Sequence, residues 1–330
     1  MTPPVDGIVN AFEAVWPSRL RRGCRVVLAV SGGADSVAMT HLIHDSTNQV
    51  DAGSITLAHY NHAWRETESD ADQAFVAELA EKLGHHFVTE SAECGSEKSE
   101  QAARTRRYDF LKAVTRQQGA RYLATAHTAD DQIETILHRI LRGTGLTGLT
   151  GIPATRVFDD DFVLIRPLLQ CRRSQVEDYL TSLDQPYRTD KSNADTRWTR
   201  NRLRHELLPL LRNQYNAEVD KSISQLGSIA SDALAAIEPQ IETHQAAIAI
   251  HEFGFSLPVL RPETVRFPLL EALRRTWKRH GWPEQAMTAE HWNSLADVAF
   301  GQRKSCNLPG DVQAVNSQGV VSVSRQALDQ

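Results

Sequence analysis

The sequence predicts an α/β fold built on a doubly wound, mostly parallel sheet. Short apolar runs that suit buried strands alternate with longer segments that carry apolar residues at helical spacing. The clearest run, residues 26–30, consists of valine, leucine and alanine, and a Ser/Gly loop and a helical pattern follow it. A strand that is apolar on both faces is typical of a parallel sheet covered by helices. The alternation indicates the fold class, since helical crossovers are the usual connection between parallel strands.

The first half of the chain supplies the expected elements in order. A short amphipathic helix is predicted over residues 8–22. Strands are predicted over residues 26–30, 54–60, 86–89, 122–126 and 162–165. Helices are predicted after residue 36 and over residues 69–83, 100–117, 133–141 and 174–183. Ligands of such sheets bind at the carboxyl ends of the strands. We therefore expect Ser31, residues 59–64 and residues 127–131 to share one edge of the sheet.

The loop after the first strand, residues 31–36, reads SGGADS. Glycines allow a sharp turn and a close approach to a ligand. A loop that opens a helix presents backbone N–H groups and a positive dipole end to an anion, here a phosphate. The loop lacks the lysine of GxxxxGK[ST], so transfer of a γ-phosphate is not expected. Asp35 beside phosphates requires a cation, usually Mg²⁺. A plain Gly-Gly turn with an Asp/Ser helix cap explains the turn but not the whole hexamer.

A second acidic segment follows the strand predicted at residues 122–126. His127 ends that strand, and Asp130 and Asp131 open the next helix. Asp130 shares a helix face with Glu134, and capping of the helix explains Asp130 as well as a functional role does. For Asp131 the functional interpretation is preferred, because with Asp35 it can hold one Mg²⁺ at the mouth of the sheet. For His127, packing at a strand end and contact with a nucleotide remain equally good interpretations.

Residues 143–148 contain a literal GxGxxG, GTGLTG. A dinucleotide fingerprint needs a strand before it and a helix after it. Here a predicted helix precedes the motif, and Gly151 and Pro153 follow it. We interpret the segment as a loop near the site and not as a dinucleotide pocket.

Composition limits the class of protein. The chain has 330 residues, 41% of them hydrophobic and 23% charged, which suits one large or two medium globular domains. No apolar stretch approaches the length of a membrane span, and the acidic N-terminus does not resemble a signal peptide, so no membrane partner is expected. The four cysteines form no CxxC pair, which argues against a zinc site or disulfide framework and fits the cytoplasm.

The charge distribution is uneven. Although the net charge is −5, residues 166–212 hold ten basic and six acidic residues. Such a patch can follow a phosphate backbone, but charge alone favours an ordinary solvated helix face.

The chain is expected to divide into a catalytic domain over residues 1–216 and a smaller, mostly helical domain over residues 217–330. In the second region, helices are predicted over residues 229–250, 269–280 and 287–299. A turn at residues 307–310 and one closing strand at residues 320–324 complete it.

The order of the motifs resembles that of the tRNA(Ile)-lysidine synthetase family of PP-loop ATP pyrophosphatases, over roughly residues 24–216. The motifs are, in order, SGGADS, HYNHAWRETESDAD, EQAARTRRYDFL, ATAHTADDQIETILHRILRGTGLTGLTGIP, RPLL and DKSNADTRWTRNRLRHELLP. SGGxDS alone indicates only the superfamily, and the last long blocks give the specificity. One departure is visible: the family usually has Asn-His-Gly-Leu-Arg where this chain has residues 61–65, NHAWR. The local turn and the shape of the pocket are expected to differ there.

The resemblance implies a reaction and its partners. In the family, ATP adenylates the C2 oxygen of the wobble cytidine in tRNA(Ile) with a CAU anticodon, and pyrophosphate leaves. The ε-amine of free lysine then attacks C2 and displaces AMP. The second domain helps to hold the tRNA. A homodimer is one expectation for the oligomeric state.

The resemblance also assigns the site residues. The phosphates of ATP are expected to bind Ser31, Gly32, Gly33, Ala34, Asp35 and Ser36. His127 is expected to contact the nucleotide, and Asp35 and Asp131 to bind Mg²⁺. The residues expected to act in catalysis are Asp35 and Asp131 together with Arg200 and Arg204, which with Asn201 contact the tRNA or the adenylate.

Two alternatives remain open. Another PP-loop enzyme is the nearer one, although a tRNA thiolase should show paired cysteines and an NAD or GMP synthetase should lack the RNRLRH block. The more distant alternative is a non-catalytic nucleotide- or RNA-binding module, which would tolerate the loss of Asp35 or Asp131.

Overall fold

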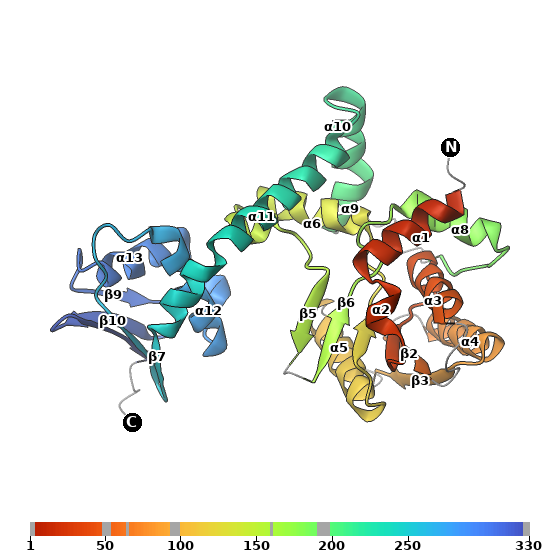
Figure 1. The fold of residues 1–330 in the computed structure, drawn as a ribbon, viewed down its shortest axis with the longest axis horizontal. Helices are drawn as coiled ribbons and strands as arrows, with labels where there is room; N and C mark the ends of the chain where they lie inside the picture. Colours follow the sequence, from red (N-terminus) through yellow and green to blue (C-terminus); the bar gives the residue numbers. More distant parts are fainter. Residues whose placement is uncertain are drawn as a thin grey trace. The chain divides into compact units, whose positions relative to one another are not determined.

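The computed structural model describes residues 4–47, 54–63, 66–92, 100–158, 161–189 and 199–325 (Figure 1). The chain divides into two compact units, Met1–Ala230 and Ser231–Gln330. This division falls within the long helix α11 (Val219–Ala246). The domain boundary expected between residues 216 and 217 remains a prediction. Within the described ranges, no helix is long and apolar enough to cross a membrane.

A six-stranded sheet forms the centre of the first unit, in the order β3-β2-β1-β4-β6-β5. The strands are β1 (Val26–Ala29), β2 (Ile55–Asn61), β3 (His86–Ser91), β4 (Tyr122–Ala124), β5 (Thr155–Phe158) and β6 (Phe162–Ile165). All neighbours pair in parallel except β5, which is antiparallel to β6. The predicted doubly wound, mostly parallel sheet is therefore confirmed. The edge strand β5 was not predicted, because it is largely exposed and carries no apolar run.

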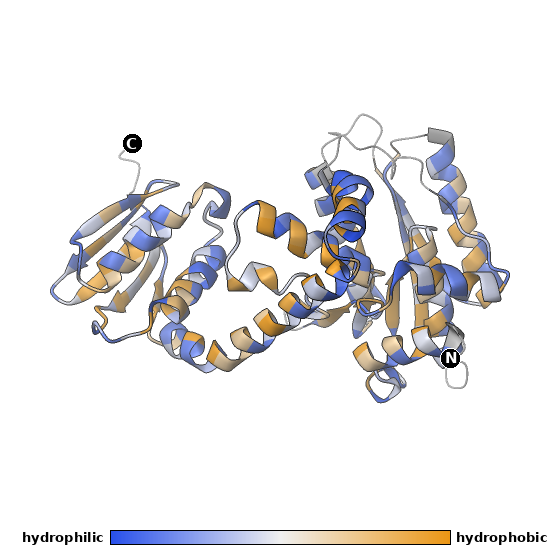
Figure 2. Cartoon of the chain, turned by 90° about the horizontal axis from the view of Figure 1, so that it is seen from above, coloured by the Kyte–Doolittle hydropathy of each residue, from blue (hydrophilic) through white to orange (hydrophobic). Residues whose placement is uncertain are grey.

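Helices cover both faces of this sheet, and the side chains of β1 pack against helices on each face. Val26 and Leu28 pack with one set of helices and Val27 with the other, as the alternation of side chains along a strand requires. On the first face lie α1 (Pro4–Val15), α3 (Ala34–Thr47), α4 (Glu66–Leu83) and α8 (Arg173–Ser182). On the second face lies α5 (Glu100–Gln117). Figure 2 shows the central strands in the colour of apolar residues.

Further helices complete the first unit. They are α2 (Ser18–Arg21), α6 (Ala129–Leu141), α7 (Leu146–Leu149), α9 (Thr199–Arg202), the π-helical turn η3 (Leu203–Leu207) and α10 (Leu208–Gln214). The single helix predicted over residues 8–22 is wrong in one respect, because the structure divides it into α1 and α2. Pro17 lies between them, and a proline disfavours the helical conformation of the residue before it.

The second unit contains more sheet than the one closing strand that the sequence predicted. Five antiparallel strands lie in the order β7-β8-β11-β10-β9. They are β7 (Ala249–His251), β8 (Gly254–Pro258), β9 (Ser305–Leu308), β10 (Val312–Ser317) and β11 (Val320–Arg325). With them lie the end of α11, α12 (Arg266–Arg279), the 3₁₀ turn η4 (Glu284–Ala286) and α13 (Ala289–Ala299). The smaller, mostly helical second region is confirmed, and the sequence missed only the extent of its sheet: helices and a complete sheet share one core around Trp277, Trp282 and Trp292.

Candidate functional site

The loop between β1 and α3 has the conformation that the SGGADS motif predicts. Gly32 adopts a φ of 90°, where a side chain is strained, and a Cβ atom there would lie 3.4 Å from Arg188 Cγ. The Ser36 hydroxyl donates to the Gly33 carbonyl at 2.9 Å and accepts from the Ser31 backbone N–H at 3.2 Å. Because α3 begins at Ala34, the loop leads directly into a helix N-terminus. The arrangement suits a phosphate bound by backbone N–H groups and hydroxyls.

Asp35 lies in the first turn of α3, at the same edge of the sheet. Its Oδ1 atom is buried and has no hydrogen-bond partner among the described residues. Burial, together with a smaller effect of the Asp131 charge, raises the pKa of Asp35 to about 6 despite the opposing effect of Arg173. A buried carboxylate oxygen without a donor is a good position for a cation.

Asp131 lies at the start of α6, which follows β4. Its Oδ2 atom accepts a hydrogen bond from the Thr128 backbone N–H at 2.9 Å, and its own N–H points to the Thr128 hydroxyl at 3.4 Å. The two residues form a capping box, so one carboxylate oxygen of Asp131 stabilises the helix start. Burial tends to raise the pKa of Asp131, but Arg200 and the Thr128 N–H hold it below its usual value.

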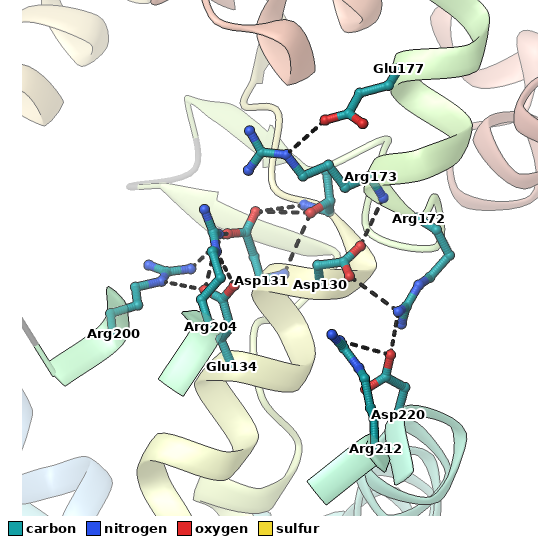
Figure 3. Close-up of polar contacts among 11 residues, drawn as sticks. Asp130, Asp131, Glu134, Arg172, Arg173, Glu177, Arg200, Arg204, Arg212 and Asp220 are labelled. Atoms are coloured by element: carbon teal, nitrogen blue, oxygen red, sulfur yellow. Dashed lines mark hydrogen bonds and ion pairs between the residues drawn. The ribbon is translucent and has the colours of Figure 1, made fainter. Parts of the chain in front are cut away.

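The other oxygen of Asp131 belongs to a cluster with Glu134, Arg200 and Arg204 (Figure 3). Arg200 Nη2 lies 2.8 Å and Arg204 Nη2 3.5 Å from Asp131 Oδ1. Glu134, only 2% exposed, accepts from Arg200 Nε at 2.9 Å and from Arg204 Nε at 2.5 Å. Of the expected catalytic residues, the structure thus brings Asp131, Arg200 and Arg204 into direct contact, and it adds Glu134.

Sequence reasoning missed this role of Glu134, although a signal existed. We paired Glu134 with Asp130, four residues away, whereas it acts with Asp131, three residues away. Both spacings put side chains on neighbouring positions of a helix surface, so the spacing alone did not show which of the two aspartates shares partners with Glu134.

Asp130 points to a different set of partners. Its carboxylate accepts from the backbone N–H of Arg173, the first residue of α8, at 2.8 Å and lies 3.2 Å from Arg172 Nη2. Arg172 also forms an ion pair with Asp220. A second arginine, Arg212, contacts the same carboxylate, with 3.0 Å between Arg212 Nη2 and Asp220 Oδ2 (Figure 3). Asp130 therefore ties α6 to the start of α8 and, through Arg172, to α11. Of the two interpretations left open, the structural one accounts for these contacts.

His127 follows β4, with its Nδ1 atom 3.1 Å from the Thr125 hydroxyl. Burial lowers the pKa of His127 to about 4, so the ring is neutral at neutral pH. His59, at the end of β2, contacts the Val30 carbonyl at 2.9 Å through Nδ1. Both histidines thus lie at the expected edge of the sheet, while a nucleotide contact of His127 stays a prediction.

Parts of the predicted site lie outside the described residues, namely Trp64, Arg65 and residues 190–198. The GxGxxG segment is described. It follows helix α6 and includes the one-turn helix α7, so it does not have the strand before it that a dinucleotide fingerprint requires. Arg139 on α6 donates to the carbonyls of Gly148 at 2.9 Å and Gly151 at 2.7 Å, which holds this segment beside α6.

Among the residues that the structure describes, no group of three or more His, Cys, Asp or Glu side chains is arranged to hold a metal ion. A cation held by Asp35 and Asp131 would therefore complete its coordination with phosphate and water oxygens, as Mg²⁺ commonly does.

Comparison with known proteins identifies the family. A family model described as a PP-loop domain matches residues 9–211. The tRNA(Ile)-lysidine synthase of Rhodopirellula baltica is 34% identical over 353 residues, covering 94% of this chain and 88% of the relative. That of Thermus thermophilus is 36% identical over 310 residues, covering 90% of this chain and 56% of the relative. The chain thus spans most of the first relative and little more than half of the second.

The comparison with solved structures agrees at the level of the fold. A U34-tRNA thiolase from Methanococcus maripaludis superimposes with a TM-score of 0.55 over 69% of this chain and 79% of that chain, at 16% identity. An identity this low shows the fold alone. The evidence for the family is the match over residues 9–211 and the 34% identity to a relative matched over most of its length. The chain therefore belongs to the PP-loop proteins and, among them, to the tRNA(Ile)-lysidine synthases.

Proposed function

We propose that this chain ligates free lysine to C2 of the wobble cytidine of tRNA(Ile) with a CAU anticodon, through an adenylated cytidine, with release of pyrophosphate and AMP. Membership of the family makes the chain an ATP-dependent ligase that acts on tRNA. One observation supports the assignment of residues: β1 and β4 are adjacent parallel strands, so the SGGADS loop that follows β1 and Asp131 at the start of α6, which follows β4, lie at the same edge of the sheet.

The first step joins the α-phosphate of ATP to the C2 oxygen of cytidine. The N–H groups and hydroxyls of residues 31–36 bind the phosphates, and His127 contacts the nucleotide. The ligand set fits Mg²⁺, because a buried oxygen of Asp35 accepts no hydrogen bond from any described residue and the pKa of Asp131 is lowered, which keeps that carboxylate ionised. When bound there, Mg²⁺ would offset the charge that develops on the departing pyrophosphate.

Arg200 and Arg204 are the residues of the cluster that we expect to contact the substrate. Both hold carboxylates in the structure, and Arg200 is still 47% exposed. We propose that they contact the tRNA or the phosphate of the adenylate, where guanidinium groups form strong charged hydrogen bonds. Glu134 keeps both side chains beside Asp131 until then.

The second step depends on a change of leaving group. An oxygen at C2 leaves poorly, whereas AMP leaves well, so adenylation makes C2 open to attack by the ε-amine of lysine. The amine must lose a proton before it attacks. A cytoplasmic location, where tRNA and free lysine occur together, and a homodimer remain predictions.

The test follows AMP formation by the purified chain with ATP, Mg²⁺, lysine and tRNA(Ile) bearing CAU, beside an Asp35→Ala variant. We expect AMP together with lysine-labelled tRNA, both lost in the variant. AMP without transfer of lysine would support the alternative of another PP-loop enzyme. Absence of AMP under every condition would contradict the proposed activity and leave a nucleotide-binding module.

A further inference from the structure

The segment that follows α8 returns to the SGGADS loop through Arg188. The Arg188 backbone N–H donates to the Gly32 carbonyl at 2.9 Å. The Arg188 side chain packs against the same residue, because a Cβ atom on Gly32 would lie 3.4 Å from Arg188 Cγ and 3.5 Å from Phe75 Cδ1 of α4. Arg188 therefore contacts the loop on the side that faces α4.

An acidic residue of α4 holds the Arg188 side chain in place. The Arg188 Nε atom donates to Asp72 Oδ1 at 2.8 Å. Both side chains are partly exposed, 43% for Arg188 and 33% for Asp72. Because Nε carries only one of the N–H donors of an arginine, this contact leaves the donors on the two Nη atoms. No described residue accepts a hydrogen bond from these Nη atoms, so the guanidinium group is oriented by Asp72 and still has donors to offer.

Arg188 brings positive charge to a part of the loop that the other arginines do not explain. Arg173 and Arg204 act on Asp35, at the start of α3. Arg188 instead lies against Gly32, earlier in the loop. The charge of Asp72 also reaches His59 at the end of β2, but burial lowers the pKa of His59, so that ring is neutral at neutral pH. Arg188 therefore offsets the negative charge of Asp72 beside the loop.

We propose that the Nη groups of Arg188 bind a phosphate oxygen of ATP while Asp72 keeps hold of Nε. This inference rests on the proposed function, in which residues 31–36 bind the phosphates of ATP. A guanidinium group forms strong charged hydrogen bonds with phosphate, and its planar fork matches the spacing of two phosphate oxygens. A side chain that is already oriented loses little freedom when it binds a ligand.

A phosphate of the tRNA backbone is the other phosphate to consider. The position of Arg188 favours ATP, because its main chain is bonded to Gly32 and its side chain packs on that glycine. Both contacts tie Arg188 to the loop that leads into the N-terminus of α3, where phosphate binding is expected. A contact with the tRNA backbone would require neither of them.

The experiment measures equilibrium binding of a non-hydrolysable ATP analogue and of adenosine, which lacks phosphates, to the full chain with Mg²⁺. Arg188→Gln should weaken binding of the analogue about 10- to 100-fold, the range for hydrogen bonds to charged groups, and leave the affinity for adenosine unchanged. Arg188→Lys keeps the charge but loses the fork, so it should give a smaller loss for the analogue alone. The lysine variant decides the matter if the glutamine variant fails to fold.

Arg116→Gln is the matched control. Arg116 is 44% exposed, and its Nε atom donates to Asp161 Oδ2 at 2.9 Å, much as Arg188 donates to Asp72. It lies at the end of α5, just before the amino end of β4 and therefore at the edge of the sheet opposite the SGGADS loop. Arg116→Gln should keep the wild-type affinities for both ligands.

Three results would overturn the proposal. The first is an unchanged affinity for the analogue in both Arg188 variants. The second is an equal loss for the analogue and for adenosine, which would mean that Arg188 only maintains the shape of the loop. The third is weaker and less salt-dependent tRNA binding with an unchanged affinity for the analogue, which would assign Arg188 to the tRNA backbone.

These outcomes are separable from those of the proposed function, because the analogue binds without tRNA, lysine or ligation. A protein that binds the analogue through Arg188 but forms no lysidine would contradict only the proposed function. Formation of lysidine, with an affinity for the analogue that does not depend on Arg188, would contradict only this inference.

Discussion

Glu134 on α6 and Arg204 on the turn η3 are joined by two hydrogen bonds, 2.5 Å from Arg204 Nε to Oε1 and 3.1 Å from Nη2 to Oε2. The carboxylate is almost fully buried, and Arg200 holds its Oε2 atom from α9. Seventy positions of sequence separate Glu134 from Arg204, so this contact fixes the RNRLRH segment against the helix that carries Asp131. The arginines expected to contact substrate thus have a defined starting position.

Glu134→Gln should lower both activity and stability. The amide keeps the shape but leaves two guanidinium groups with Asp131 as their remaining acidic partner in the cluster. We expect a loss of about 2 kcal/mol in the free energy of unfolding, less than for a fully buried pair because Arg200 is half exposed. Denaturant unfolding measures this loss of stability, and the rate of AMP formation should fall in the same variant.

The control for this change is Glu177→Gln, which removes the exposed Arg173–Glu177 pair at 3.3 Å. Its effect on stability should stay within about 0.5 kcal/mol, as is usual for surface pairs. Equal losses in the two variants would mean that the Glu134 cluster contributes no more than a surface ion pair.

Asp35→Asn should abolish pyrophosphate release from ATP and yet stabilise the ligand-free protein. One buried oxygen of the carboxylate has no hydrogen-bond donor in the described ranges of the chain, so its charge opposes folding when no cation is bound. A pKa raised from 3.8 to about 6 corresponds to a gain of at most about 3 kcal/mol on neutralising the group. Thermal unfolding of both proteins measures the gain, and added Mg²⁺ and ATP should stabilise only the wild type. An asparagine variant that is less stable than the wild type would contradict the assignment.

The pH dependence of this difference has a definite sign. Because the pKa of Asp35 is higher in the folded protein than in the unfolded chain, the folded state binds the proton more tightly. The destabilisation by Asp35 is therefore complete above pH 6 and fades as the pH falls from about 6 toward 3.8. The stability difference between Asp35→Asn and wild type should shrink over that interval in denaturant titrations at several pH values. A difference that is constant from pH 7 to pH 4 would show that the group titrates normally.

The sequence was sufficient for the central sheet of the first unit because its strands are apolar on both faces, as β1 illustrates with Val26, Val27 and Leu28 all buried. It was insufficient for most strands of the second unit, because strands such as β9 bury only alternate residues, Cys306 and Leu308, beside exposed Ser305 and Asn307. Half-buried short strands give a weak signal against the longer helical patterns around them.

The candidate site shows the same limit. The SGGADS loop is local, so its turn could be predicted from its glycines. The partners of Glu134 come from α9 and η3, far along the chain, and no local pattern indicates which acidic residue of α6 they select. Likewise, nothing local distinguishes Asp130, which holds α8, from its neighbour Asp131.

The segment that carries Arg200 and Arg204 should make tRNA binding dependent on salt. Arg202, on α9 between them, is 63% exposed and forms an ion pair with the exposed Glu206 at 3.4 Å. A weak surface pair of this kind leaves the guanidinium available for a phosphate. Each phosphate neutralised releases counterions, so the logarithm of the tRNA affinity should fall linearly with the logarithm of the salt concentration.

Arg202→Gln should make the slope of this line less steep by about 0.7 to 0.9, the value for one phosphate contact. Filter binding of tRNA over a range of salt concentrations measures the slope. The control is Arg25→Gln, which removes an exposed arginine just before β1, at the opposite end of that strand from the SGGADS loop. Arg25 contacts the Gln118 carbonyl at 3.1 Å, and its loss distinguishes a specific tRNA contact from a change in net charge. Equal slopes for wild type and Arg202→Gln would remove α9 from the tRNA interface, whereas a change confined to Arg202→Gln would place it there.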